Sequence, residues 1–228
     1  MKKVNYLTFV FTILILTISF NISSYSIELK KPTDLLKKKG NSNESGKFDF
    51  KNANTGLVKT FFESSNNYMK AQEFLLIAYG KNTEAAQVKE AIAYASDAGV
   101  KDSKKMKNSI KVSNNASKSI EKSMNDESFK LTAEGKANYA KSLPYLLKGV
   151  KGTFELRPQA QNMVANIKSS PMVALKELGG ISNVIPNIPK YITTVTSTSK
   201  LVFSGAKAKK IEGSESDDLD SAMKDLSL

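Results

Sequence analysis

Residues 55–79 read TGLVKTFFESSNNYMKAQEFLLIAY, and this stretch decides the fold class. Its mainly apolar positions recur at steps of three and four residues, which is the spacing of one face of an α-helix. Those positions are Val58, Phe61, Phe62, Ser65, Tyr68, Met69, Gln72, Leu75, Leu76 and Tyr79. Thr55 and Gly56 precede the pattern and Gly80 follows it, so we expect a long amphipathic helix between them.

The same spacing predicts further helices along the chain. Residues 83–98 are expected to form a helix that Thr83 caps and Gly99 ends. Its inner face consists mainly of small apolar side chains at Ala85, Val88, Ala91, Ile92 and Ala95. Residues 132–150 predict another helix, and Pro144 inside it should kink or split it. Pro158 is expected to open the next helix, and Pro171 a short piece that ends at Gly179.

No segment has the alternating pattern of a strand, so the sequence predicts an all-α protein. We expect an antiparallel bundle of about five to six helices over residues 53–211, with one helix kinked at a proline. A disordered linker is expected over residues 27–52, which contain Pro32, Gly40 and Gly46 among polar residues. A disordered acidic tail is expected over residues 212–228, where six carboxylates face one lysine.

Residues 101–124, KDSKKMKNSIKVSNNASKSIEKSM, predict a lysine-rich helix capped by Asp102 or Ser103. Its inner seam is narrow and includes two serines: Met106, Ile110, Ser113, Ser117, Ile120 and Met124. Five lysines form a stripe on the other side: Lys104, Lys107, Lys111, Lys118 and Lys122. The stripe has two interpretations: it attaches the protein to an anionic surface, or it is a solvated face enriched in lysine by coding bias.

Residues 178–203 are nearly uncharged, with Lys190 as the only charge between Glu177 and Lys200. Ile185, Ile188 and Ile192 lie at helical steps, which favours a buried last helix. The alternative is a mobile apolar element that enters a membrane or closes over a ligand.

The chain begins with Lys2 and Lys3, an uncharged apolar run from Tyr6 to Phe20, and small residues up to Ser26. This order is typical of a secretory signal peptide, here residues 1–26. We therefore expect export through the inner membrane to a periplasmic or secreted destination. The alternative is an uncleaved anchor over residues 4–22.

Composition excludes several kinds of site. The chain has no cysteine and no histidine, so it has no disulfide, no thiolate metal ligand and no imidazole base. The phosphate-loop, dinucleotide and hydrolase-elbow motifs are absent, which favours a protein that is not an enzyme and has no cofactor. The net charge is +12, but Arg157 is the only arginine, and guanine recognition relies mainly on arginine, so nucleic acid is not an expected partner.

Arg157 is also the only side chain able to hold a carboxylate or phosphate with a planar fork. Its predicted place between two helices marks it as a candidate clamp, with a neutral structural role as the alternative.

The function expected from the sequence is an exported, non-catalytic bundle, an envelope-associated binding or structural module. Its lysine stripe would meet an anionic envelope surface or an envelope protein. The alternative is a carrier of an apolar small molecule or lipid, held between helices in a cavity near Pro144 and residues 178–203.

Overall fold

The computed structural model describes residues 48–99 and 101–226. The predicted signal peptide or anchor and most of the predicted linker lie outside these residues. Seven α-helices and two short 3₁₀ helices occur in the described part, and no strand is present there. They are α1 (Phe50–Ala78), α2 (Asn82–Ala95), α3 (Ser103–Met124), α4 (Ala133–Ser169), α5 (Pro171–Leu178), η2 (Gly179–Asn183), η3 (Ile185–Asn187), α6 (Ile188–Ala208) and α7 (Asp217–Asp225). The all-α prediction is confirmed.

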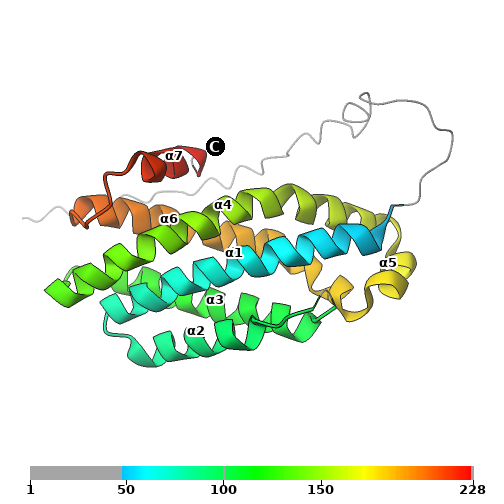
Figure 1. Ribbon diagram of the computed structural model, residues 1–228, viewed down its shortest axis with the longest axis horizontal. Helices are drawn as coiled ribbons and strands as arrows, with labels where there is room; N and C mark the ends of the chain where they lie inside the picture. The colour runs from blue at the N-terminus through cyan, green and yellow to red at the C-terminus, as the bar shows by residue number, and fades with distance from the viewer. Residues whose placement is uncertain (1–47, 100, 227–228) are drawn as a thin grey trace, which may run out of the picture. The chain divides into compact units, whose positions relative to one another are not determined.

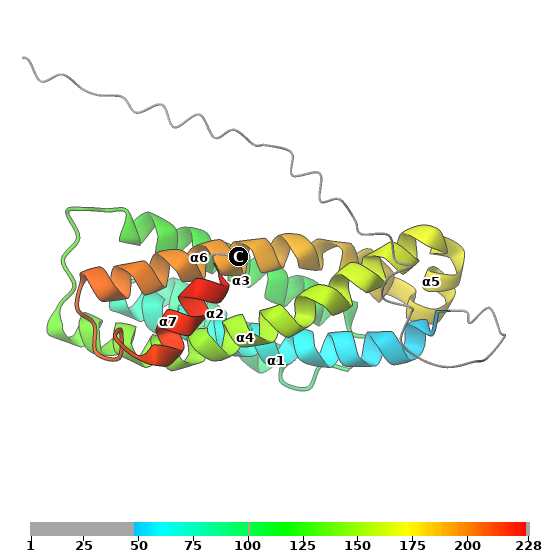
Figure 2. The same ribbon diagram turned by 90° about the horizontal axis from the view of Figure 1, so that it is seen from above.

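Four long helices form a closed ring around the core, in the order α1, α3, α6 and α4. The second helix, α2, packs against α1 and α3, and the short α5 packs against α1 and α4. The last helix, α7, packs against α4 and α6. Helices α1 to α4 alternate in direction along the chain, so that α4 runs antiparallel to α1, α3 and α6 (Figures 1 and 2).

The first helix confirms the opening pattern of the sequence, because all ten positions named for its inner face are buried. The helix ends as predicted before Gly80, whose φ of +71° lies in the left-handed region. The amide of Gly80 donates to the Ile77 carbonyl oxygen and that of Lys81 donates to the Leu76 carbonyl oxygen, which is the Schellman arrangement.

The start of α1 corrects the predicted linker. The helix begins at Phe50, capped by the Asp49 side chain, which accepts from the Asn52 amide at 3.0 Å. Phe50 is buried and packs edge-on against Phe48. Two aromatic side chains therefore anchor a segment whose polar composition had favoured a linker as far as residue 52.

Helix α4 lies unusually close to α1 because three glycines face the neighbouring helix. A Cβ atom built on Gly149 would lie 2.8 Å from the Tyr68 amide nitrogen, and one on Gly152 would lie 2.6 Å from the Ser64 Cβ. At the other end, a Cβ on Gly135 would lie 2.9 Å from the Ala78 carbonyl oxygen. Only hydrogen in place of a side chain permits this approach of the two backbones.

Pro158 does not open a new helix, so that expectation was wrong; it lies inside the continuous α4. Pro144 was expected to kink or split its helix, and since it also lies inside α4, it does not split it. A proline removes one backbone hydrogen bond, but Leu143, Leu146, Leu156 and Ala160 beside the two prolines are buried. Packing along one side therefore keeps the helix continuous.

Residues 178–203 form the end of α5, the two 3₁₀ helices and most of α6. Their apolar side chains are buried, among them Ile181, Ile185, Ile188, Val195 and Phe203. The segment therefore contains the buried helix that the spacing favoured, here α6, which α7 follows in the chain. It is not a detached apolar element. Within the described residues, no helix has both the length and the apolar composition needed to cross a membrane.

The acidic tail, predicted to be disordered, instead contains α7. Ser216 caps this helix by accepting from the Leu219 amide at 3.4 Å. Leu219, Ala222 and Leu226 are buried on one side of it. Ion pairs join the other side to the bundle, from Lys151 of α4 to Asp218 and from Lys207 of α6 to Asp220.

Candidate functional site on helix α3

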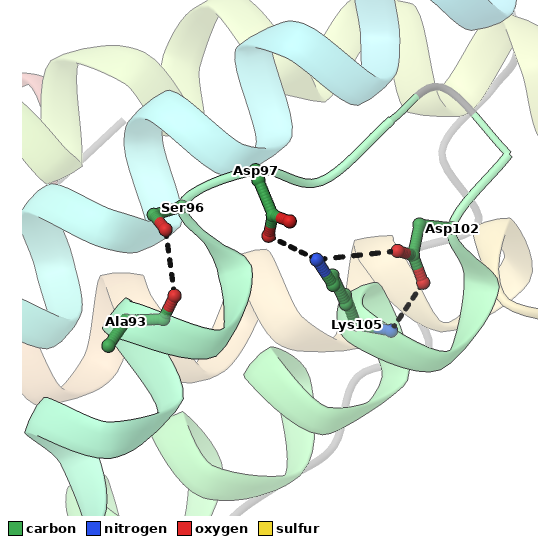
Figure 3. A network of polar contacts seen from close by, with 5 residues as sticks. All are labelled: Ala93, Ser96, Asp97, Asp102 and Lys105. Carbon is green, nitrogen blue, oxygen red and sulfur yellow. Dashed lines mark hydrogen bonds and ion pairs between the residues drawn. The ribbon is translucent and has the colours of Figure 1, made fainter.

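The start of α3 is fixed by contacts with the loop that precedes it (Figure 3). Asp102 caps the helix as predicted, since its carboxylate accepts from the Lys105 amide at 3.1 Å. The Lys105 ammonium lies between the carboxylates of Asp97 and Asp102 and contacts both. Ser96 closes the end of α2 by donating to the Ala93 carbonyl oxygen at 2.8 Å.

The contact between Lys105 and Asp97 changes the pKa of both groups. The hydrogen bond from Lys105 lowers the pKa of the Asp97 carboxyl, and the same bond raises the pKa of the Lys105 ammonium. Both groups are therefore charged at neutral pH. Lys105 holds the α2–α3 loop against α3 and does not belong to the stripe of five lysines.

The buried side of α3 is polar to an unusual degree, with Ser109, Ser113, Ser117 and Ser123 among its seven buried residues. Gln72 of α1 joins two of these serines. Its Nε2 donates to the Ser113 carbonyl oxygen at 2.8 Å and to Ser117 Oγ at 2.9 Å, while its Oε1 accepts from Ser113 Oγ at 3.0 Å. The two serines of the predicted inner seam therefore anchor α3 to α1.

Tyrosine hydroxyls extend this polar cluster inside the ring. The Tyr68 hydroxyl hydrogen-bonds to Ser117 Oγ at 3.0 Å, and burial raises the pKa of Tyr68 to about 12. On α6, Thr198 Oγ1 donates to the Glu121 carboxylate of α3 at 2.6 Å. Burial also raises the pKa of Tyr191 on α6. Contacts with two neighbouring helices thus fix the rotation of α3 about its axis.

The five lysines of the predicted stripe are all exposed. By the turn of about 100° per residue, they occupy about 60° of the helix surface, centred opposite the buried serines. We call Lys104, Lys107, Lys111, Lys118 and Lys122 the lysine face. It contains like-charged pairs four residues apart, such as Lys107 with Lys111, which cost an isolated helix a few tenths of a kcal/mol each.

Five lysines in the described part of the chain form ion pairs with carboxylates, and none of them belongs to the lysine face. Ion pairs are formed by Lys59, Lys70, Lys105, Lys151 and Lys207. No described carboxylate lies within ion-pair distance of a lysine-face ammonium. Hydrogen bonds from Ser128 lower the pKa of the Asp126 carboxyl, and the positive charge of Lys122 adds to this effect. The positive charge of this face is therefore uncompensated by the fold.

A sixth lysine, which the sequence did not indicate, lies beside the lysine face. Lys190, at the start of α6, lines a groove of about 320 Å³ together with Lys107 and Lys111. Ile110, Val184 and Tyr191 supply the apolar part of the same groove. On the other side of α3, a groove of about 490 Å³ toward α2 is lined by Lys111 and by Tyr94. Lysines from two distant segments thus converge on one surface.

Arg157 does not lie at a junction between helices, because α4 continues through it. Its guanidinium lies 5.8 Å from the ring centre of Phe154, one turn earlier on α4. It forms no ion pair with a carboxylate of the described residues. A clamp for the acid group of a ligand stays a prediction.

Among residues 48–99 and 101–226, no three acidic side chains gather closely enough to form a metal site. The carrier prediction placed its cavity near Pro144 and residues 178–203. Pro144 lines neither of the two grooves described above, but Val184, Lys190 and Tyr191 of residues 178–203 line the groove of about 320 Å³. The carrier function stays a prediction. Searches for relatives found no matching protein family, no matching curated protein and no matching solved structure.

Proposed function

We propose that this protein is an exported, non-catalytic helical module that binds an anionic surface of the cell envelope through the lysine face of α3. One observation carries the proposal: five exposed lysines lie on one side of a helix, and the described residues offer them no compensating ion pairs. An anionic partner would relieve the repulsion among these charges.

The rigid attachment of α3 supports the same proposal. The hydrogen bonds of Gln72 with Ser113 and Ser117 hold the buried side of the helix, so the lysines stay on the outside. Lys190 extends the positive surface across the groove toward α6. A partner with regularly spaced negative charges, such as lipid headgroups or an anionic polymer, fits such an extended face better than a single small acid does.

The test is co-sedimentation of residues 27–228 with envelope fragments over a series of salt concentrations. Binding should weaken steeply as salt rises, because exposed charges are screened over about 10 Å at 0.1 M salt. Charge reversal of Lys107, Lys111 and Lys118 to glutamate should weaken binding at low salt by at least ~100-fold, at about 1 kcal/mol per lysine.

The matched control is charge reversal of Lys136, Lys141 and Lys148, three exposed lysines of α4. It changes the net charge by the same amount on a different helix. Equal loss of binding in the two variants would show that only net charge matters. Undiminished binding of the α3 variant would refute the proposal.

A further inference from the structure

Helix α5 exposes an apolar surface. Five large apolar side chains are exposed in the part of the chain that the structure describes, and three of them belong to this eight-residue helix. Met172 is 77% exposed, and Val173 and Leu175 are each 50% exposed. We call these three residues the α5 apolar patch.

The opposite side of α5 is firmly attached to the bundle. Ala174 and Leu178 lie one helical turn apart and are buried, where α5 packs against α1 and α4. Pro171 begins the helix and fixes its first turn. Since the buried pair faces inward, the turn of about 100° per residue directs Met172 and Val173 away from the bundle. The α5 apolar patch is therefore exposed on a helix whose opposite side is fixed to the bundle.

Charged residues lie beside the patch. On α5, Lys176 lies between Met172 and Val173 around the helix, and the exposed Glu177 lies on the other side of Val173. Lys168 lies in the last turn of α4, three residues before α5 begins. Both lysines are exposed, and no ion pair joins either of them to a described carboxylate. Apolar side chains bordered by lysines are typical of helices that lie at the interface of an anionic bilayer, where lysines reach the phosphates and apolar groups reach the acyl chains.

The position of α5 agrees with such a role. In both views it lies at the end of the bundle where α1 begins (Figures 1 and 2). A Cβ built on Gly180, just after α5, would lie 3.2 Å from Ser103 Oγ, so the first lysine of the lysine face is near the same end.

We propose that α5 is a membrane-interface element. Met172, Val173 and Leu175 enter the boundary between headgroups and acyl chains of an anionic phospholipid bilayer, while Lys168 and Lys176 contact its phosphates. This inference rests on the proposed function in one respect: it names the anionic surface as a lipid bilayer. The apolar contact distinguishes it, because a polymer surface has no acyl layer to enter.

The test uses a reporter that the chain allows, because the protein contains no tryptophan. Met172→Trp places a single indole in the patch, and Phe129→Trp places one at an exposed site in the loop between α3 and α4 as the matched control. Each variant of residues 27–228 is mixed with vesicles of phosphatidylglycerol and with vesicles of phosphatidylcholine. We expect a blue shift and quenching by brominated acyl chains only for Met172→Trp, and only with phosphatidylglycerol.

A second set of variants measures the contribution to binding. Replacing Met172, Val173 and Leu175 with serine should leave the melting temperature unchanged and weaken vesicle binding at least about tenfold. The deficit should persist at about 1 M salt, where screening over about 3 Å removes most of the lysine contribution. Replacing exposed Phe129 with serine removes apolar area in the loop between α3 and α4 and should not weaken binding.

The outcomes separate the two proposals. Vesicle binding with no tryptophan shift at position 172 would overturn the α5 inference and leave the lysine face standing. Binding to envelope fragments but not to vesicles would also overturn the α5 inference, and it would indicate that the lysine face binds a polymer or a protein. A tryptophan shift that survives charge reversal of Lys107, Lys111 and Lys118 would support α5 while counting against the lysine face.

Discussion

The hydrogen bonds of Gln72 across the α1–α3 contact allow a quantitative prediction. Replacing Gln72 with methionine keeps nearly the same volume and removes all three hydrogen bonds to Ser113 and Ser117. At about 1 kcal/mol for each bond, the loss is about 3 kcal/mol, of which the greater hydrophobicity of methionine restores about 1 kcal/mol. The free energy of unfolding should therefore fall by about 2 kcal/mol.

The double variant tests the reasoning more sharply than the single one. In Gln72→Met, the Ser113 hydroxyl loses its partner and stays buried, which accounts for part of the cost. Adding Ser113→Ala removes that unsatisfied hydroxyl. The double variant should thus be at least about 1 kcal/mol more stable than the sum of the two single losses predicts.

The assay is urea unfolding followed by circular dichroism, with calorimetry as a second measurement. A loss of about 2 kcal/mol should lower the melting temperature by about 4–8 °C in a domain of this size. Gln87→Met, at an exposed position on α2, is the control and should change stability by less than about 0.5 kcal/mol. Additive single losses, or a neutral Gln72→Met, would refute the proposed role of the polar cluster.

Three further predictions concern other parts of the bundle. Burial raises the pKa of Tyr79 to about 12, so above about pH 10 the folded chain keeps a proton that the unfolded chain releases, and stability falls as pH rises. Tyr79→Phe should reduce that loss in unfolding titrations, by at most roughly 2 kcal/mol at pH 12. Gly149→Ala should lower the free energy of unfolding by about 1 kcal/mol, because the clash of the new Cβ with the Tyr68 backbone outweighs the gain in helix propensity. In the control Gly56→Ala, the new Cβ would meet its nearest atom at 3.7 Å, so the free energy of unfolding should not fall. Leu219→Ser should detach α7 and speed cleavage after Glu215 by a glutamate-specific protease several-fold, while the cooperative melting transition of α1 to α6 is kept. An unchanged cleavage rate would contradict the anchoring role of Leu219.

The sequence was most informative where the physical cause is local. The cap at Asp102 and the end at Gly80 depend on a few neighbouring residues, and both were predicted correctly. The exposed positions of the lysine face follow from helical spacing alone. These features need no knowledge of which helices meet.

The features that could not be predicted depend on contacts between distant segments. Lys190 is far from Lys107 in the sequence, and only the packing of α6 against α3 brings them to one groove. The continuity of α4 through Pro158 depends on the surface it packs against. In the tail, carboxylates outnumber apolar residues such as Leu219 and Ala222, so the composition favoured disorder. The structure compensates two of these carboxylates with lysines of α4 and α6, which the sequence alone does not reveal.

The close approach of α1 and α4 has a consequence for the order of folding. The backbones of Tyr68 and Gly149 touch, yet about 80 residues separate them, including all of α2 and α3. Closing a loop of that length costs about 2 kcal/mol more in chain entropy than closing one of about 10 residues. We therefore expect the α1–α2 and α2–α3 hairpins to form first and the close contact between α1 and α4 to form late.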